Sequence, residues 1–508
     1  MSEPLVIRRP RLRLVLNTVA NASAQVVSFI VTLVTLPLLL NAYGKSIYGL
    51  FILASTVVGV VVLFDFGLGM TTTRQVAAAA ATGDERELAG TVSASITLYS
   101  LIGVVATVVL VIIATFAGQI FHVTSVQATL LKLMLYWQAA FQLITWPAIP
   151  GRYVLGGYQR YGTVALFAVI SAVLSAAAIA FVLITGRGPL VLTALNGAIT
   201  ALCTIGMLIS ALFSVPAQAR RNFRPQLGSA SRALLSLGLP LFLVQMAAFL
   251  MRQQADRLII GVVMGAAAIG LYEAAAKLAS SIAQINELSY SALLPYVTQL
   301  HAREEHERLA STFVMGSRYL SLLLMPGILL VLLFAPQLIQ LWIGAGLGLS
   351  ATAARLLLAS LLIWPLVMVG DTIILGRGQI RRWAPVALCV GVLNVALSFI
   401  LVHPFGIIGV ALGTLIAGVV EAPLQLRLTL KLAAVSLRDW TCRAALPNLP
   451  ALALTIAAWW ALQSLRIIPR TLMGLVAIMF VVLLVAWVLS FVLFLQKDAR
   501  RFIVQRRG

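Results

Sequence analysis

Residues 471–495 read TLMGLVAIMFVVLLVAWVLSFVLFL and contain no charged side chain. A helix rises about 1.5 Å per residue, so a run of this length exceeds the roughly 30 Å thickness of a bilayer's hydrocarbon core. An uninterrupted apolar run of this length therefore predicts a helix that spans a membrane.

Thirteen further apolar stretches of similar length precede this one, and composition supports the same interpretation for the whole chain. Of the 508 residues, 61% are hydrophobic and 10% are charged, whereas a soluble domain carries about 25% charged residues. A soluble protein of this size is therefore excluded. We predict an all-α polytopic membrane protein of about fourteen transmembrane helices at residues 15–40, 47–69, 92–117, 129–150, 162–185, 190–214, 233–260, 267–297, 313–335, 351–375, 384–402, 407–428, 447–464 and 471–495.

The charges are strongly biased, with 36 Lys and Arg against 15 Asp and Glu and a net charge of +21. In a soluble protein this surplus would indicate nucleic-acid binding, but here most of the basic residues lie between apolar stretches. If the N-terminus is cytoplasmic, 26 of the 36 fall in predicted cytoplasmic segments, as the positive-inside rule requires. We therefore expect a multi-pass protein with both termini in the cytoplasm and no nucleic-acid partner.

Two sequence matches predict an internal repeat. Ile47-Tyr48-Gly49-Leu50 opens the second predicted helix and Ile269-Gly270-Leu271-Tyr272 the eighth, with the tyrosines 224 residues apart. The segment at 155–159 (LGGYQ) resembles the one at 375–379 (LGRGQ), at an offset of 220. We expect two parallel six-helix repeats, residues 1–231 and 232–446, followed by an extra helix pair and a basic tail at 447–508. Transporters commonly bind substrate between such repeats.

The eighth predicted helix carries a long polar stripe. Glu273, Lys277, Ser280, Gln284, Glu287 and Ser291 are separated by steps of three and four, which place them on one helical face. Each charge near the bilayer centre costs roughly 2.5–3.5 kcal/mol, so this face is not expected to contact lipid. It is expected to line a wet cavity or to pair with another helix. A structural ion pair between Glu273 and Lys277 is the alternative.

Two other helices offer matching polar faces. On the seventh, Gln245, Arg252 and Asp256 share a face, with Arg257 beside them, and the first carries Asn17, Asn21 and Gln25. Arginine binds phosphate oxygens in a bidentate manner, so a cationic cavity with amides suits a pyrophosphate that bears sugars. We predict substrate binding by Arg252, Arg257, Lys277, Gln245, Gln284, Asn17, Asn21 and Gln25. Intramembrane carboxylates couple transport to ion gradients, and for this role we predict Asp256, Glu273, Glu287 and Asp65. Interhelical hydrogen bonding is the alternative role for the amides of the first helix.

No catalytic motif is apparent. The chain has no Walker motif, its three cysteines and four histidines are scattered without metal-ligand spacing, and its predicted outer loops are short. We therefore expect no enzyme activity, no catalytic residue, no metal and no cofactor. A membrane glycosyltransferase or ligase is disfavoured because it would be expected to carry acidic residues in large outer loops.

These features are accompanied by a family likeness. The stretches Leu36-Pro37-Leu38-Leu39-Leu40, 43–50 (YGKSIYGL) and 63–69 (LFDFGLG) resemble the start of a Wzx-type polysaccharide flippase. Asp256-Arg257, 270–275 (GLYEAA) and Leu294-Pro295 resemble the seventh and eighth helices of that family. Such flippases belong to the multidrug/oligosaccharidyl-lipid/polysaccharide exporter superfamily, and the likeness covers nearly the whole chain.

The resemblance implies a flippase of the bacterial inner membrane. Its substrate would be an undecaprenyl-diphosphate-linked oligosaccharide, moved to the outer leaflet by alternating access for the synthesis of a surface polysaccharide such as an O-antigen or exopolysaccharide. By position, it assigns transport roles to Arg252, Asp256, Arg257, Glu273 and Lys277, and its partners would be membrane lipids and the polysaccharide polymerase and chain-length machinery. Alternatives are a drug or cation antiporter of the same superfamily, a lipid II flippase, which the uncharged first helix disfavours, and a non-transporting assembly scaffold.

Overall fold

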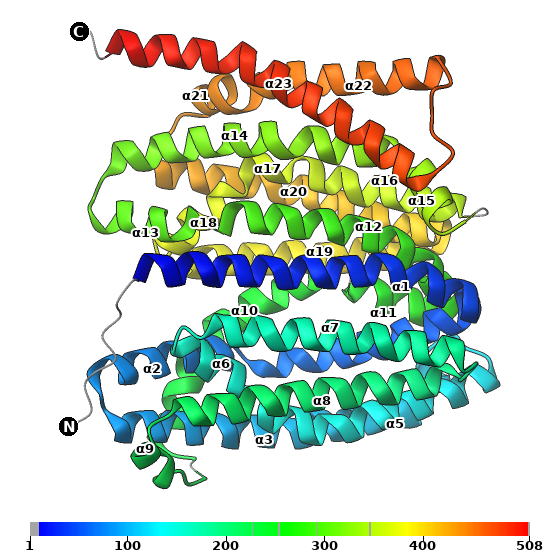
Figure 1. Cartoon of the computed structure of the whole chain (residues 1–508), viewed down its shortest axis with the longest axis vertical. Coiled ribbons are helices and arrows are strands. Elements are labelled where there is room, and N and C mark those ends of the chain that lie inside the picture. The colour runs from blue at the N-terminus through cyan, green and yellow to red at the C-terminus, as the bar shows by residue number, and fades with distance from the viewer. Residues whose placement is uncertain (1–9, 226, 252–253, 292, 345–346, 506–508) are drawn as a thin grey trace. The chain divides into compact units, whose positions relative to one another are not determined.

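The computed structural model describes residues 10–225, 227–251, 254–291, 293–344 and 347–505, and these residues form helices and no strand (Figure 1). Each predicted span overlaps a helix. Among the described residues, ten helices are long and apolar enough to cross a membrane. The structure thus confirms an all-helical, multi-pass membrane protein, while the number of fourteen spans stays a prediction.

The chain divides into two compact units. The N-terminal unit comprises Met1–Met246 with Gly261–Gly270, and the C-terminal unit comprises Ala247–Ile260 with Leu271–Gly508. The first contains α1 (Pro10–Val61), η1 (Val62–Asp65), α2 (Leu68–Thr82), α3 (Glu85–Thr115), α4 (Ala117–Ile120), α5 (Ser125–Ala148), α6 (Pro150–Gly157), α7 (Tyr161–Ile184), α8 (Pro189–Ser214), α9 (Ala217–Arg221) and most of α10 (Ser229–Met251).

Two breaks shape the start of the N-terminal unit. Gly44 lies within α1 but has φ 72° and ψ 168°, so it separates the first two predicted spans. The second span ends at η1, after which Phe66 (φ 49°) and Gly67 (φ 73°) both adopt left-handed conformations before α2 begins. Glycine tolerates this backbone without a steric penalty. The apolar run therefore ends in a sharp turn directly after Asp65.

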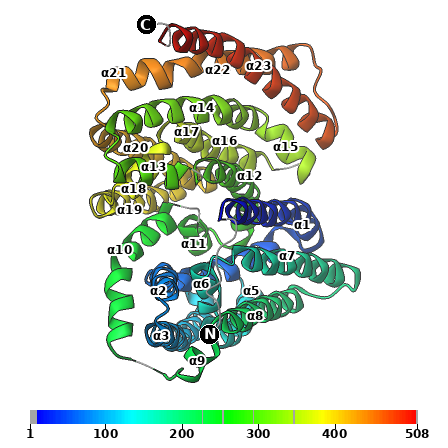
Figure 2. The same cartoon turned by 60° about the vertical axis from the view of Figure 1, so that its left-hand side comes forward.

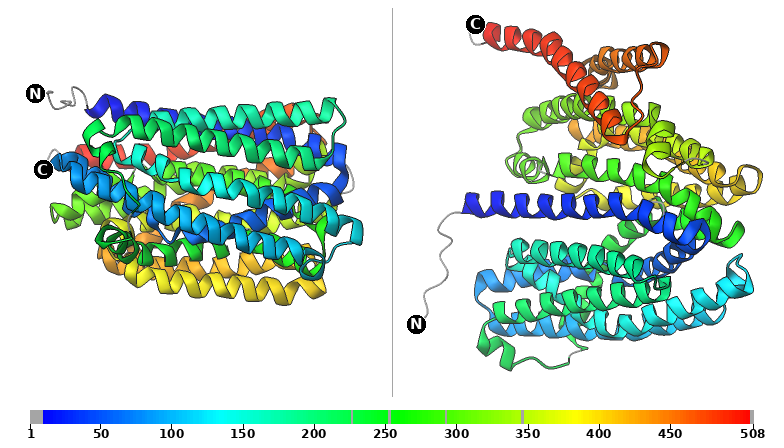
Figure 3. Two further views of the ribbon diagram at one scale, coloured as in Figure 1. Left: turned by 90° about the horizontal axis from the view of Figure 1, so that it is seen from below. Right: turned by 45° about the vertical axis from the view of Figure 1, so that its right-hand side comes forward.

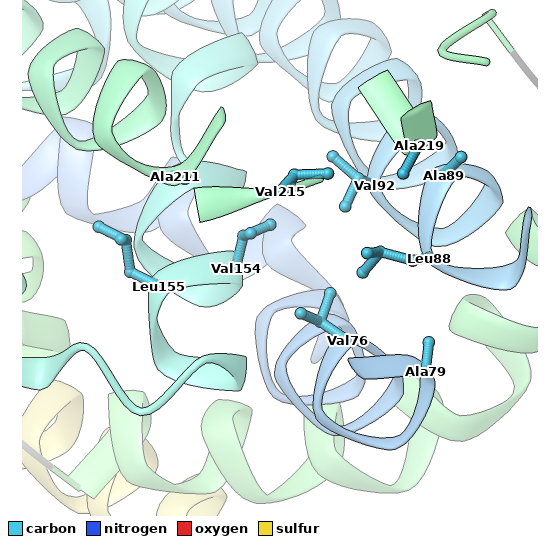
Figure 4. Close-up of a cluster of buried hydrophobic side chains, with 10 residues drawn as sticks. All are labelled: Val76, Ala79, Leu88, Ala89, Val92, Val154, Leu155, Ala211, Val215 and Ala219. Atoms are coloured by element: carbon cyan, nitrogen blue, oxygen red, sulfur yellow. The ribbon is translucent and has the colours of Figure 1, made fainter. Parts of the chain in front are cut away.

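The core of this unit near the start of α3 is closely packed. Side chains of α2, α3, α6 and α8 and their following segments form one cluster (Figure 4), made up of Val76, Ala79, Leu88, Ala89, Val92, Val154, Leu155, Ala211, Val215 and Ala219. A Cβ atom on Gly157 would lie 2.6 Å from Val76, so the second glycine of the 155–159 segment lets α6 approach α2. The glycine-rich match used to identify the repeat is thus a helix-packing contact.

The C-terminal unit contains the rest of the helices. They are the end of α10, α11 (Gln254–Val263), α12 (Ala266–Ser291), α13 (Leu293–Ala302), α14 (His306–Leu333), α15 (Ala335–Trp342), α16 (Gly348–Leu362), α17 (Trp364–Val367), α18 (Val369–Gly376), α19 (Ile380–Phe405), α20 (Ile407–Ala433), α21 (Leu437–Trp440), η2 (Thr441–Ala445), η3 (Leu446–Asn448), α22 (Leu449–Ser464) and α23 (Leu472–Gln505). Residues of α11 and α12 belong to both units. The final helices α22 and α23 pack on each other and on α14 (Figure 3).

The two units repeat the same order of helix contacts. In the N-terminal unit α2 packs on α6, α3 on α5, and both α5 and α7 on α8. In the C-terminal unit α13 packs on α18, α14 on α16, and both α16 and α19 on α20 (Figure 2). The repeated contact order within each unit agrees with the internal repeat read from the sequence.

The first sequence match also has a structural counterpart, within the N-terminal unit. A Cβ atom on Gly49 would collide with the carbonyl of Ala266, and one on Gly270 with the carbonyl of Lys45. Gly49 thus contacts the residue four positions before Gly270, and Gly270 contacts the residue four positions before Gly49. The two glycines correspond at an offset of 221, which agrees with the 220 of the second match better than the tyrosine offset of 224 does.

Candidate functional site

A buried group of three charges lies on α11 and α12. The Nε atom of Arg257 lies 2.7 Å from Oε2 of Glu273, and Nζ of Lys277 lies 3.7 Å from its Oε1. The exposed fractions of these side chains are 9% for Arg257, 1% for Glu273 and 33% for Lys277. One carboxylate therefore bridges two cations, of which only Lys277 has substantial exposure.

Asp256, the residue before Arg257, takes part in a second buried contact with α12. Its Oδ2 atom accepts hydrogen bonds from the hydroxyls of Tyr272 at 2.5 Å and Thr414 at 3.2 Å. Its Oδ1 atom is buried and has no hydrogen-bond partner in the part of the chain that the structure describes. Since Asp256 is fully buried, this oxygen is also shielded from solvent.

Thr414 is in turn part of a group of hydrogen-bonded polar atoms on α19 and α20. Ser398 donates to the carbonyl of Val410 at 3.3 Å and to Oδ1 of Asn394 at 3.5 Å, while Nδ2 of Asn394 donates to the carbonyl of Leu250 at 2.8 Å. Thr414 also lies within 3.3 Å of the Val410 carbonyl. Thr414 thus connects the carboxylate of Asp256 to the polar groups of α19 through the carbonyl of Val410.

A tight turn between α19 and α20 explains how these oxygens meet. Gly406 has φ 58° and ψ −137°, which favours glycine, and joins the two helices into a hairpin. A Cβ atom on Gly413 would lie 2.7 Å from Oγ of Ser398. The small residue thus lets the backbone of α20 approach the polar face of α19.

The N-terminal unit holds its own buried carboxylate at the break after η1. Asp65 accepts hydrogen bonds from the hydroxyls of Tyr99 and Tyr153, both at 3.0 Å, and from the backbone N–H of Gly69 at 3.1 Å. The last of these bonds satisfies an N–H at the start of α2, as a capping residue does. Asp65 lies inside this unit, where three donors hold its carboxylate.

The other predicted residues are less tightly grouped. Gln245 and Gln284 are exposed and Glu287 is half-buried, so the stripe on α12 is buried at Glu273 and open further along. Arg252 lies outside the described residues. The backbones of Asn17, Asn21 and Gln25 are helical in α1, but their side chains also lie outside the description. The structure therefore brings Arg257, Glu273 and Lys277 together beside Asp256, and the functional roles of all the predicted residues stay predictions.

Several residues of these clusters were not predicted from the sequence. Asn394 and Ser398 are four residues apart in an otherwise apolar segment, and that spacing was a usable signal for a polar patch. Thr414, Tyr99 and Tyr153 gave no comparable pattern. Their partners lie 158, 34 and 88 residues away in the sequence.

The described residues contain no group of three or more His, Cys, Asp or Glu side chains arranged to hold a metal ion. Asp256 is a different arrangement, in which a single carboxylate accepts hydrogen bonds from two hydroxyl groups.

Comparison with known proteins agrees with this architecture. Residues 14–301, more than half of the chain, match the family described as "Polysaccharide biosynthesis protein". No curated protein sequence matches the chain.

Among solved structures, "Lipid II flippase MurJ, inward closed conformation" aligns with a TM-score of 0.68 at 15% identity, covering 95% of this chain and 100% of that one. An inward-facing multidrug resistance MATE family transporter of the MOP superfamily aligns with a TM-score of 0.60 at 17% identity, covering 80% of this chain and 99% of that one. At these identities the likeness shows the fold alone. The chain thus belongs to the polysaccharide biosynthesis protein family and has the fold of the MurJ and MATE transporters of the MOP superfamily.

Proposed function

We propose that this protein is a flippase that moves an undecaprenyl-diphosphate-linked oligosaccharide from the inner to the outer leaflet of the bacterial cytoplasmic membrane by alternating access, driven by an ion gradient. The observation that carries the proposal is the buried group Arg257, Glu273 and Lys277 beside Asp256, in a chain of which only 10% of the residues are charged. Intramembrane charges are costly and therefore indicate function. The family match supports a role in polysaccharide synthesis.

The charges suit a diphosphate because two cations share a single carboxylate. In the described conformation the guanidinium of Arg257 donates a hydrogen bond to the carboxylate of Glu273. An incoming diphosphate would compete with Glu273 for Arg257 and would first meet Lys277, the most exposed of the three. Guanidinium groups bind phosphate oxygens through two parallel hydrogen bonds, so this exchange replaces one charge-assisted contact with another.

Asp256 supplies the coupling in this scheme. Protonation or cation binding at its unpartnered Oδ1 atom reduces the negative charge on the carboxylate. It therefore weakens the hydrogen bonds that Asp256 accepts from Tyr272 on α12 and Thr414 on α20. Helix α12 also carries Glu273, and α20 also carries the carbonyl of Val410, which accepts from Ser398 and Thr414. Ion occupancy at Asp256 is thereby linked to the helix that holds the anion-binding group.

The proposal is tested by reconstituting the protein into liposomes with a fluorescent diphosphate-linked oligosaccharide lipid and measuring its exposure in the opposite leaflet. We expect translocation that increases with a proton or sodium gradient and falls strongly in Arg257→Met. Val262→Met, which introduces the same side chain at an exposed position of α11, is the matched comparison for general damage. If the lipid stays in its leaflet while a cationic drug is exchanged, the antiporter alternative replaces the flippase. If only a pentapeptide-bearing lipid II is moved, the lipid II alternative does so.

The remaining parts of the proposal concern surroundings. We propose an inner-membrane location with both termini cytoplasmic, and action beside the polymerase and chain-length machinery that consumes the flipped unit. Deletion of the gene should cause lipid-linked oligosaccharide to accumulate on the cytoplasmic leaflet. Unchanged export would refute the cellular role.

A further inference from the structure

A second buried carboxylate lies on α20, away from the site described above. Glu421 is 9% exposed, and within the described residues it makes neither a hydrogen bond nor an ion pair. An ionised carboxylate in such a place would have little access to solvent and no compensating cation. Because that state is strongly disfavoured, the environment selects the neutral acid.

Gln425, one helical turn later, has a matching deficiency. Its Nε2 atom donates to Oδ1 of Asp371 at 2.8 Å and to the carbonyl of Val367 at 3.3 Å. The carbonyl of Val367 can only accept a hydrogen bond, so the amide nitrogen of Gln425 must face it, and this fixes the orientation of the amide. The oxygen Oε1 is then left buried, and it has no donor within the described part of the chain.

The two side chains share one polar face of α20. Thr414, Glu421, Gln425 and Thr429 are separated by steps of seven, four and four, which keep them on the same side of a helix, and all four are buried. Residues four apart have their Cβ atoms about 5–6 Å from each other. A protonated Glu421 is therefore within side-chain reach of the unpartnered oxygen of Gln425.

This pair is distinct from the cluster around Asp256. Seven residues of helix separate Glu421 from Thr414, the contact of Asp256 on α20, which corresponds to roughly 10 Å along the axis. The carboxyl group closest in the hydrogen-bonded network is that of Asp371, reached through the Gln425 amide. Glu421 was not among the residues predicted from the sequence, since one acidic residue in an apolar stretch shows no spacing pattern.

The charges on neighbouring helices do not neutralise Glu421. The helices packed against α20 are α14, α16, α17, α18 and α19. Their charged or titratable side chains, with those of α20 itself, are His306, Glu307, Arg308, Arg318, Tyr319, Arg355, Asp371, Arg381, Arg382, Cys389, His403, Arg427 and Lys431. None of them forms an ion pair with Glu421 among the described residues.

We propose that Glu421 is a proton-binding site separate from Asp256, whose neutral carboxylic acid donates a hydrogen bond to the amide oxygen of Gln425. The proton is taken from water and returned to water when the helices around α20 rearrange. While it is bound, the acid links two neighbouring turns of α20, and Gln425 continues the contact to α17 and α18. The site therefore senses proton availability at a helix that also carries Thr414. The proposal concerns proton binding alone and does not rest on the identity of the transported substrate.

Dicyclohexylcarbodiimide provides a direct probe, since it reacts with protonated carboxyl groups in apolar surroundings. The carboxyl proton transfers to a carbodiimide nitrogen, the carboxylate oxygen adds to the central carbon, and rearrangement to the N-acylurea retains every atom of the reagent. The full-length protein in lipid nanodiscs is treated over a range of pH and digested, and the peptides are weighed by mass spectrometry. We expect an adduct on Glu421 whose yield falls as the pH rises, with little adduct on the exposed Glu304.

Infrared spectroscopy checks the same group without requiring reagent access. The carbonyl stretch of a protonated carboxylic acid should be present in the wild-type spectrum and reduced in Glu421→Gln, a variant of nearly the same size that still places polar atoms beside Gln425. Identical wild-type and Glu421→Gln spectra in this region would overturn the proposal, whatever the labelling result. Neither measurement involves flipping, so a failed flippase assay leaves this result standing, and the reverse also holds.

Discussion

Replacing Glu273 by Gln gives the most informative test of the buried charge group. The change keeps the size of the side chain but leaves Arg257, which is 9% exposed, without the carboxylate 2.7 Å from its Nε atom. Breaking a buried ion pair by removing one partner costs about 3–5 kcal/mol, because the other charge stays buried and uncompensated. We therefore expect Glu273→Gln to lower the free energy of unfolding by about that amount.

The third member of the group should behave differently. Lys277 lies 3.7 Å from Glu273 and is 33% exposed, and ion pairs with that much solvent access contribute about 0–1 kcal/mol. Lys277→Met is therefore expected to reduce stability by less than about 1 kcal/mol. It serves as the control because it also removes a charged partner of Glu273, but a more exposed one.

A double substitution separates the cost of an orphaned charge from the value of the pair. Replacing a buried pair with apolar side chains of similar volume is often neutral or stabilising. Arg257→Met combined with Glu273→Leu should therefore be more stable than either single variant. Such non-additivity is characteristic of residues in direct contact.

The assay is equilibrium unfolding in mixed micelles of dodecyl sulfate and a mild detergent, followed by circular dichroism and tryptophan fluorescence. The reasoning is refuted if Glu273→Gln and Lys277→Met shift the midpoint equally. It is also refuted if the effects of Arg257→Met and Glu273→Leu simply add in the double variant.

Three further changes test other contacts. Asp256→Asn keeps an oxygen for the two hydroxyl donors but cannot be charged. Translocation in liposomes should therefore lose its response to an ion gradient, while the thermal unfolding temperature stays near that of the wild type. A preserved gradient response would exclude Asp256 from coupling. Tyr99→Phe and Tyr153→Phe each remove one hydrogen bond to the buried Asp65, and each should cost about 1.5–3 kcal/mol in urea or dodecyl sulfate unfolding; a change below about 0.5 kcal/mol in both would contradict the contacts. Gly49→Ala would push a methyl group into the carbonyl of Ala266 and should lower the unfolding temperature, whereas Gly188→Ala, where the Cβ meets open space and φ is −76°, should change it little.

The membrane fold was predictable because it depends on composition and on uninterrupted apolar length. The run at 471–495 contains no charge, and the structure places all of it except Thr471 in α23. The glycine-rich segments that led us to predict a repeat include close helix contacts, as Gly157 shows against Val76. Such features are local, or are repeated locally, and therefore leave a trace in the sequence.

The pairing of the site residues was only partly predictable. Helical spacing places Lys277 one turn after Glu273, and the two are in contact as the i, i+4 spacing predicts. The shorter contact, between Glu273 and Arg257, depends on the turn between α11 and α12, where Gly265 has φ 86°. The meeting of Thr414 with Asp256 depends on how α20 packs within the C-terminal unit, and helical periodicity carries no information about that packing.

Two adjacent contacts join α11 to α12 in register, and this has a mechanical consequence. Asp256 accepts a hydrogen bond from Tyr272, and Arg257 donates one to the carboxylate of Glu273. Consecutive residues of α11 therefore contact consecutive residues of α12. Displacement of Tyr272 from Asp256 therefore also disturbs the neighbouring ion pair. In the function that we propose, a diphosphate that draws Arg257 away from Glu273 would conversely weaken the support for the hydrogen bond at Asp256. Because each change alters the free energy of the other, the coupling that we propose between ion and substrate needs no longer pathway than one turn of α12, and reciprocity of binding free energies requires that it act in both directions.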